Sequence, residues 1–397
     1  MKVIAAEGTH EKIGFDLGCR LAEAIKHNVA LREHDTRERG IEKKQLSSLV
    51  HRYMESSSAV SLKMMEGLSR GSGVPFTSIL RFNALQDVIS PEGCTNFAAV
   101  GKATPDGDAI LLKNRDLSGN KTFSGSTYYN YREINITLVL KTPDKNVMVG
   151  VTAAGSTGFM MGLNKYGVAV ASNFGQTIEV SHVPPGQLYG MSGRTQMMRE
   201  ALECSSLKDA VNLALGKLTD SPMGTPGILW FVDARNIYVV EGSFDQFAVM
   251  HIQDGIAVRS NHFLLLDQLN NEKALSSVCR KIRGNQLLEE NYGNINKEKM
   301  MEFSMDHMNG PGSNSICRHA KNPEESVTVS ASIMELNGKN PEKSKISIAL
   351  GTPCWAWRNS AGNFTFQMDT DIETIPKNFR DGSVYKDFIK VEPFGGG

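Results

Sequence analysis

The chain has 397 residues, of which 40% are hydrophobic and 22% charged, which is ordinary for a soluble globular protein. Its 43 Lys and Arg residues balance its 43 Asp and Glu residues, so no long-range field draws it to nucleic acid or to an anionic membrane. No apolar run is long enough to cross a bilayer, and Glu7, Glu11 and Lys12 interrupt the start where a signal peptide would need an apolar segment. We therefore expect a cytoplasmic protein with neither a nucleic-acid nor a membrane partner, and the oligomeric state stays open.

Helices are predicted in the first quarter of the chain. Apolar residues recur at helical spacing from Ile13 to Ile25 and from Leu46 to Leu68. Gly71-Ser72-Gly73, followed by Pro75, ends the second of these stretches, and residues 76–87 read as a further short helix.

From Cys94 the pattern changes to strands joined by turns. Two apolar runs, 94–100 and 109–117, flank the turn Thr104-Pro105-Asp106-Gly107 and predict an antiparallel hairpin. A turn centred between Pro105 and Asp106 places Cys94 opposite Leu117, give or take one residue.

The rest of the chain predicts further hairpins and inserted helices. Hairpins are expected at 159–172, 228–241 and 247–259, and single strands at 147–151, 327–333, 346–350 and 364–367. Helices are expected at 194–202, 207–215, 272–290 and 296–306. Consecutive hairpins with helices between them predict an α+β fold with antiparallel sheet, not a doubly wound parallel sheet.

Six cysteines stand far apart, at positions 19, 94, 204, 279, 317 and 354. None forms a C-x-x-C pair, so free thiols are expected, and Cys279, Cys317 and Cys354 are interpreted as core thiols. His262, His307 and His319 give no short H-x-x-x-H pair and are interpreted as hydrogen-bonded structural residues. No metal and no cofactor are therefore predicted.

Cys94 differs from the other cysteines in its neighbours. Gly93 precedes it, and the predicted hairpin brings Arg115 and Asp116 to the same end. The alternative is an ordinary turn followed by a core strand. A thiol, a guanidinium and a carboxylate that meet behind a glycine favour a nucleophile, and they are compatible with self-cleavage.

Short motifs then follow one another over nearly the whole chain. They are Glu66-Gly67-Leu68 with Gly71–Val74, Gly93-Cys94-Thr95, Asn114-Arg115-Asp116, Gly162-Leu163-Asn164 with Gly167 and Asn173, Arg259–Phe263, Ser315–His319 and Gly351–Cys354. Each is weak alone, but in this order and spacing the chain resembles the penicillin acyltransferase family of autoproteolytic N-terminal-nucleophile (Ntn) hydrolases. It is more distantly similar to bile salt hydrolase and penicillin V acylase.

The resemblance implies a fold and a processing step. The fold would be a four-layer αββα sandwich of antiparallel sheets. Cleavage between Gly93 and Cys94 would leave residues 1–93 as a helical segment, bound to residues 94–397 as the catalytic chain, and the two would form one αββα unit. The chemistry fits the residues, because glycine has no Cβ to block its carbonyl and a new α-amino group of pKa about 7.7–8.0 can accept the thiol proton.

The resemblance also assigns roles to side chains. Asp116 would hold the new amine, and Asn261 would donate to an oxyanion. Asn173 would be the other active-site asparagine, and Arg318 would close over Cys94 and can pair with Asp116. Each has a plainer alternative: a solvated strand-end carboxylate for Asp116, and strand termination for the two asparagines. Arg115 is either a cation that favours the thiolate or a surface charge.

These residues predict an amidohydrolase or acyltransferase that acts on the amide bond of a small N-acyl compound through a thioester on Cys94. Water as the second nucleophile gives hydrolysis and an amine gives transfer, and the sequence does not separate the two. The alternatives are an acyl-CoA-dependent N-acyltransferase to an amine and an uncleaved, non-enzymatic scaffold.

Overall fold

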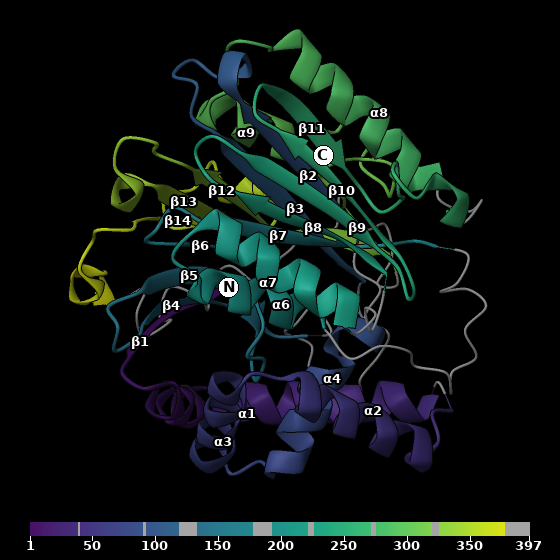
Figure 1. Ribbon diagram of the computed structural model, residues 1–397, viewed down its shortest axis with the longest axis vertical. Helices are drawn as coiled ribbons and strands as arrows, with labels where there is room; N and C mark the ends of the chain where they lie inside the picture. Colours follow the sequence, from purple (N-terminus) through teal and green to yellow (C-terminus); the bar gives the residue numbers. More distant parts are fainter. Residues whose placement is uncertain are drawn as a thin grey trace.

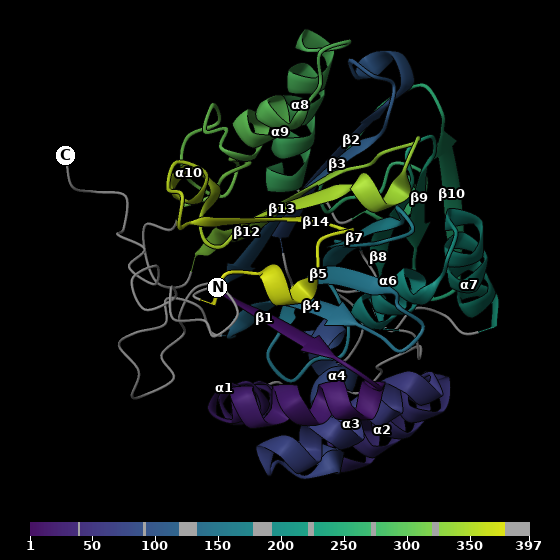
Figure 2. The same cartoon turned by 90° about the vertical axis from the view of Figure 1, so that its left-hand side faces the viewer.

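The computed structural model describes residues 1–38, 40–89, 93–118, 133–177, 193–220, 226–270, 275–319 and 325–377. Two β-sheets face each other, and helices cover their outer sides (Figures 1 and 2). This confirms the predicted α+β, four-layer αββα architecture expected of an Ntn hydrolase. No helix in these ranges is long and apolar enough to cross a membrane.

Four helices from the start of the chain form most of one outer layer: α1 (His10–Glu38), α2 (Lys43–Ser56), α3 (Ala59–Ser72) and α4 (Phe76–Ile89). The predicted 46–68 helix is in fact parts of α2 and α3, because the Ser58 hydroxyl caps a new helix by accepting from the Ser61 N–H. Gly73 ends α3 with a φ of +72°, as the glycine run predicts. Residues 2–7, for which no element was predicted, form strand β1 (Lys2–Glu7).

The same outer layer continues with α6 (Arg194–Glu203) and α7 (Leu207–Asp220). The opposite outer layer holds α8 (Leu275–Glu290), α9 (Lys297–Ser304) and the short α10 (Pro353–Ala356). The first three residues of the predicted 272–290 helix lie outside the described ranges.

The larger sheet has the strand order β1-β4-β5-β6-β7-β8-β9-β10. Its further strands are β4 (Asn135–Lys141), β5 (Val147–Ala153), β6 (Met161–Asn164), β7 (Ala169–Phe174), β8 (Gly227–Val232), β9 (Ile237–Gly242) and β10 (Phe247–Ile252). Neighbouring strands are antiparallel, except that β1 pairs with β4 in parallel.

The smaller sheet has the order β11-β2-β3-β12-β13-β14 and is antiparallel throughout. Its strands are β2 (Gly93–Val100), β3 (Ile110–Ser118), β11 (Gly255–Arg259), β12 (Ser326–Glu335), β13 (Lys345–Ala349) and β14 (Asn363–Gln367). The predicted 247–259 hairpin is wrong, because β10 pairs with β9 while β11 pairs with β2 in the other sheet. Two runs joined by a short turn show that strands follow each other, but not which sheet each one joins.

The β2–β3 register also differs from the prediction. Cys94 lies opposite Arg115, and Gly93 lies opposite Asp116. A 3₁₀ turn at Gly101–Ala103, which Gly101 enters with a φ of +69°, moves the centre of the connection to between Thr104 and Pro105. This shift by one residue changes every pair by two positions, so Cys94 is not opposite Leu117.

Among the described residues, three large buried cores hold the layers together. One lies between the larger sheet and the outer helices α1, α3, α4, α6 and α7, one between the two sheets, and one between the smaller sheet and α8, α9 and α10. Ala98 of β2 belongs to the core between the sheets, whereas its neighbour Phe97 packs in the outer core. By strand alternation Cys94 faces the larger sheet, and Gly93 faces the α8 layer.

Candidate active site

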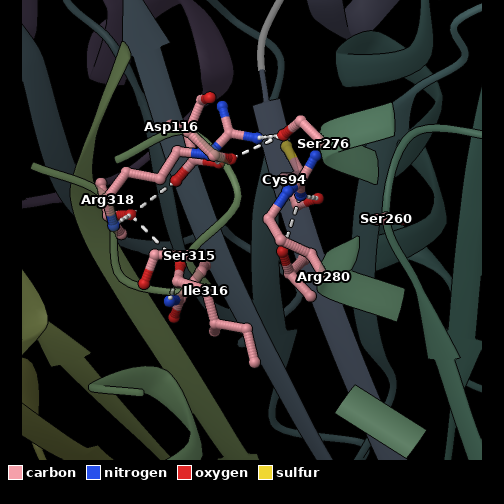
Figure 3. A network of polar contacts seen from close by, with 12 residues as sticks. Cys94, Asp116, Ser260, Ser276, Arg280, Ser315, Ile316 and Arg318 are labelled. Atoms are coloured by element: carbon pink, nitrogen blue, oxygen red, sulfur yellow. Dashed lines mark hydrogen bonds and ion pairs between the residues drawn. The ribbon is translucent and has the colours of Figure 1, made fainter. Parts of the chain in front are cut away.

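Cys94 is the second residue of β2, and its side chain is fully buried. Its backbone N–H donates to the Asn261 Oδ1 at 3.2 Å, and its carbonyl accepts from the Arg280 guanidinium. Figure 3 shows Cys94 and Arg280 together with Asp116 and Arg318. The backbone on both sides of the thiol is therefore held by side chains from two other segments.

Gly93 lies against a buried ion pair. The Arg318 Nε is 3.2 Å from the Asp116 Oδ2, and both side chains are almost completely buried. A Cβ on Gly93 would lie 2.7 Å from the Arg318 Nη1 and 2.8 Å from the Asp116 Oδ2. The predicted carboxylate and arginine thus flank the residue that precedes the thiol, and only glycine fits there without a shift.

Two hydroxyl groups hold this ion pair in place. The Thr328 hydroxyl donates to the Asp116 Oδ1 at 2.7 Å, and the Ser276 hydroxyl accepts from the Arg318 Nη2 at 3.0 Å. The Arg318 N–H also donates to the Thr328 hydroxyl at 2.8 Å. Asp116 is therefore not a solvated strand-end carboxylate.

Arg280 of α8 is a residue that the sequence analysis missed. It is fully buried and donates to the Cys94 carbonyl, to the Thr95 hydroxyl at 2.8 Å and to the Asn261 Oδ1 at 2.7 Å. Burial, helped by the charge of Arg318, lowers the pKa of Arg280 to about 9, so it is still cationic at neutral pH. A signal was present, because Arg280 falls on the buried stripe of α8 with Ser277, Gly284 and Leu287.

The two asparagines hold the loops beside Cys94 in different ways. Asn261 accepts through Oδ1 from Cys94 and Arg280, and its Nδ2 donates to the Phe174 carbonyl at 2.9 Å. Asn173 accepts from the Trp230 indole N–H at 3.0 Å and donates to the Arg259 carbonyl at 3.4 Å. Both asparagines lie at this end of the molecule, but only Asn261 shares a described hydrogen bond with Cys94.

Arg115 lies opposite Cys94 and is completely buried. Its guanidinium bonds to the Oδ1 of Asn135, the first residue of β4, and lies 3.4 Å from the carboxylate of Glu133, which precedes that strand. The surface-charge alternative for Arg115 is therefore wrong. Its position on the thiol-bearing face of β2 keeps it a candidate for favouring the thiolate.

The histidines separate into two places. His262 bonds to the Ser277 hydroxyl at 2.8 Å, and burial lowers its pKa. His307 and His319 instead lie together with Cys317 and Cys354, although the sequence spacing gave no reason to group them.

This arrangement can support acyl transfer. The buried thiol follows a glycine, which has no Cβ. The Asp116–Arg318 pair lies beside that glycine, and Arg280 donates to the Cys94 carbonyl. Cations near a thiol lower its pKa, and a carboxylate can hold an amine that is released next to it.

Several solved structures resemble the chain weakly. The N-acylethanolamine-hydrolyzing acid amidase ortholog of Caenorhabditis elegans is 15% identical, with a TM-score of 0.41, over 61% of this chain and 92% of that chain. A mutant of the conjugated bile acid hydrolase from Clostridium perfringens is 12% identical, with a TM-score of 0.42, over 71% of this chain and 95% of that chain. The penicillin V acylase of Agrobacterium tumefaciens is 11% identical, with a TM-score of 0.38, over 65% of this chain and 83% of that chain. No curated protein matches the sequence.

A family model also matches the chain in sequence. The model described as acyl-coenzyme A:6-aminopenicillanic acid acyl-transferase matches residues 103–354, more than half of the length. The matched range contains Asp116, Asn173, Asn261 and Arg318, but it begins after Cys94, so the case for that nucleophile rests on its surroundings. The chain therefore belongs to the acyl-coenzyme A:6-aminopenicillanic acid acyl-transferase family, a family of Ntn-type amide hydrolases and acyltransferases.

Proposed function

We propose that the protein cuts itself between Gly93 and Cys94, and that the new N-terminal Cys94 then attacks the amide bond of a small N-acyl compound. The observation that carries this proposal is the contact of Gly93 with the Asp116–Arg318 pair, directly before a buried thiol. A core strand that began at Cys94 by chance would need neither a buried carboxylate nor a buried arginine beside its first residue.

The self-cleavage step is an acyl shift from nitrogen to sulfur. The Cys94 Sγ adds to the Gly93 carbonyl carbon, the C–N bond to Cys94 breaks, and the Cys94 nitrogen takes up a proton and leaves as an amine. Water then hydrolyses the thioester, which releases the Gly93 carboxylate and restores the thiol. The missing Cβ lets the carbonyl be approached closely.

The new amine would form beside groups that are already in place. The Asn261 Oδ1 accepts from the Cys94 N–H before cleavage, and it can accept from the amine afterwards. Asp116 lies beside Gly93 and can hold the new amine once that amine is protonated. An α-amino group of pKa about 7.7–8.0 can take the thiol proton at neutral pH, so nucleophile and base belong to one residue.

Oxyanion stabilisation is proposed for Asn261 and Asn173. The Asn261 Nδ2 donates to the Phe174 carbonyl, and a side-chain amide has two N–H groups, so donation to an oxyanion would use the second one. Arg280 already donates to the Cys94 carbonyl, which makes it a positioning residue for the nucleophile.

The cleaved segment would stay bound as part of one unit. Strand β1 pairs with β4 along its whole length, and α1 packs against the larger sheet. Within α1, the Asn28 Nδ2 donates to the carbonyls of Ile134 and Ala154, and the Arg32 guanidinium bonds to the Glu133 carboxylate at 2.9 Å. These contacts do not involve residue 93, so cutting the bond after Gly93 leaves them intact.

The acyl acceptor decides between two enzymes with the same thioester. Hydrolysis of an N-acyl compound is the first candidate. The family description favours acyl-CoA-dependent transfer to an amine as a second one. Incubation with N-acyl amino acids and N-acyl amines, with and without acyl-CoA and an acceptor amine, separates them, because product that forms only with acyl-CoA identifies the transferase.

Intact mass spectrometry tests the processing step. The wild-type protein should give two fragments that meet between Gly93 and Cys94, and Cys94→Ala should stay one chain. Cys204→Ala, a half-buried cysteine of another layer, is the matched control and should cleave normally. A wild-type chain that stays intact after long incubation yet hydrolyses amides would refute self-cleavage.

Thiol labelling tests the non-enzymatic alternative. In the processed enzyme Cys94 should react with iodoacetamide much faster than the half-buried Cys204 and Cys279, because nearby cations favour the thiolate. Slow labelling of Cys94 in a chain that never fragments would leave only the scaffold.

A further inference from the structure

Four side chains from separate parts of the chain converge beside α9. They are His307, which follows α9, Cys317 and His319 on the next loop, and Cys354 in α10. Their ligand atoms all lie within 4.8 Å of one another. Figure 2 shows α9 and α10 on the same side of the smaller sheet.

We propose that these two cysteines and two histidines bind one structural Zn²⁺ ion. Two thiolates and two imidazoles are a common donor set for tetrahedral zinc. Binding would release the two thiol protons to solvent and form two Zn–S and two Zn–N bonds, with no change of oxidation state.

Three of the six distances between the ligand atoms are close to the edges of a tetrahedron around zinc. Zinc bond lengths of about 2.0–2.1 Å to nitrogen and 2.3 Å to sulfur imply edges of about 3.3 Å for N···N and 3.6 Å for N···S. The two Nε2 atoms are 3.0 Å apart. The His319 Nε2 is 3.9 Å from the Cys317 Sγ and 3.4 Å from the Cys354 Sγ. Each measured edge therefore needs to change by only about 0.3 Å or less around a central ion.

Hydrogen bonding alone fits these atoms less well. The His319 Nε2 faces the His307 nitrogen and both sulfurs at once. One imidazole nitrogen has either a single N–H or a single lone pair, so it cannot serve three partners. A cation between the four atoms uses one lone pair from each of them.

Backbone hydrogen bonds hold Cys317 and His319 in place without a zinc ion. The Cys317 N–H donates to the Asp306 carbonyl at 3.0 Å, and the His319 N–H donates to the Pro311 carbonyl at 2.7 Å. The Arg283 guanidinium bonds to the Asp306 carboxylate at 2.9 Å and ties this loop to α8. Zinc would add a metal-mediated link from this loop to α10 through Cys354.

The position of the cluster gives the ion a second effect. Arg318 lies between the two ligands Cys317 and His319, and its guanidinium pairs with Asp116 beside Gly93. An ion that fixes the residues on both sides of Arg318 would fix the direction in which that side chain leaves the loop. This second effect rests on the proposed self-cleavage, whereas zinc binding itself does not.

Metal analysis of the purified full chain tests the site. The wild-type protein, after dialysis with ZnCl₂ under reducing conditions, should hold about one zinc per chain, and Cys354→Ser and His319→Gln should each lower its zinc affinity at least about 100-fold. Cys279→Ser is the matched control, because this half-buried cysteine lies outside the cluster and should bind zinc normally. A chelator should lower the Tm of the wild type by at least about 5 °C and leave that of Cys354→Ser unchanged.

Three results would overturn the site. The first is less than about a tenth of an equivalent of zinc in the folded wild type. The second is a Cys317–Cys354 disulfide, seen as a mass two units lower that persists without reductant and blocks zinc uptake. The third is equal zinc affinity in Cys354→Ser and the wild type. Because metal content is read without substrate, a failure of self-cleavage with normal zinc would count only against the proposed function.

Discussion

Replacing Gly93 with alanine tests the contact on which the proposed cleavage site depends. The new Cβ would lie 2.7 Å from the Arg318 Nη1, 2.8 Å from the Asp116 Oδ2 and 3.1 Å from the Asp116 Cβ. The two terminal atoms cannot simply rotate away, because Ser276 and Thr328 hold the pair. We expect a loss of about 1–3 kcal/mol in the free energy of unfolding, the usual cost of overpacking a buried site.

The measurement uses an uncleavable background so that processing does not complicate it. Gly93→Ala is combined with Cys94→Ala, and its urea unfolding is compared with that of Cys94→Ala alone. Gly216→Ala in the same background is the control, because α7 leaves open space around Gly216 and alanine there should stabilise by up to about 1 kcal/mol. If Gly93→Ala unfolds at the same urea concentration as its parent, the close approach of the pair to Gly93 is not real.

Three further substitutions test buried residues near Cys94, the first by its effect on self-cleavage and the other two by their effect on stability. Arg280→Lys should slow self-cleavage at least about tenfold in an intact-mass time course, because a compact ammonium lacks the two separate Nη atoms that reach the Cys94 carbonyl and the Asn261 Oδ1. Gly284→Ala should lower the free energy of unfolding by about 1–3 kcal/mol in urea, since its Cβ would lie 2.7 Å from the Val258 Cγ2. Glu241→Gln should lower the free energy of unfolding by about 3–5 kcal/mol in urea, because it leaves the buried Arg259 without its ion partner. Wild-type stability in the Gly284 or the Glu241 variant would contradict the packing described.

Local sequence patterns predicted where the helices and strands lie better than they predicted which strands pair. The hairpin of β6 and β7 follows from two apolar runs and a glycine at residue 167, which adopts a φ of +76°. The β10–β11 turn looks equally good in sequence, yet the chain crosses there from one sheet to the other. Choice of partner depends on which apolar faces meet in the folded core, and no short window of sequence contains that information.

The same limit applies to the site. Gly93 and Cys94 are adjacent, and Asp116 lies one hairpin away, so local reasoning could group them even with the register wrong by two. Arg280 reaches Cys94 across 186 positions of sequence. His307 and Cys354 meet only because α9 and α10 pack on one side of the smaller sheet. The sequence can mark each such residue as a charge or a thiol on a buried face, but it does not show that these residues lie together.

Burying the cationic side chains around Cys94 lowers the stability of the fold, so their burial needs another explanation. The chain is neutral overall, yet Lys113, Arg115 and Arg280 are fully buried on or beside β2 and β3. Lys113 donates to the carbonyls of Met160 and Ser172, so its positive charge faces backbone dipoles. Apolar residues of similar size would give a stability at least as high at these positions. The proposed thiol chemistry gives a reason for burying Arg280, which donates to the Cys94 carbonyl, and Arg115, which lies opposite Cys94, because cations near a thiol favour the thiolate.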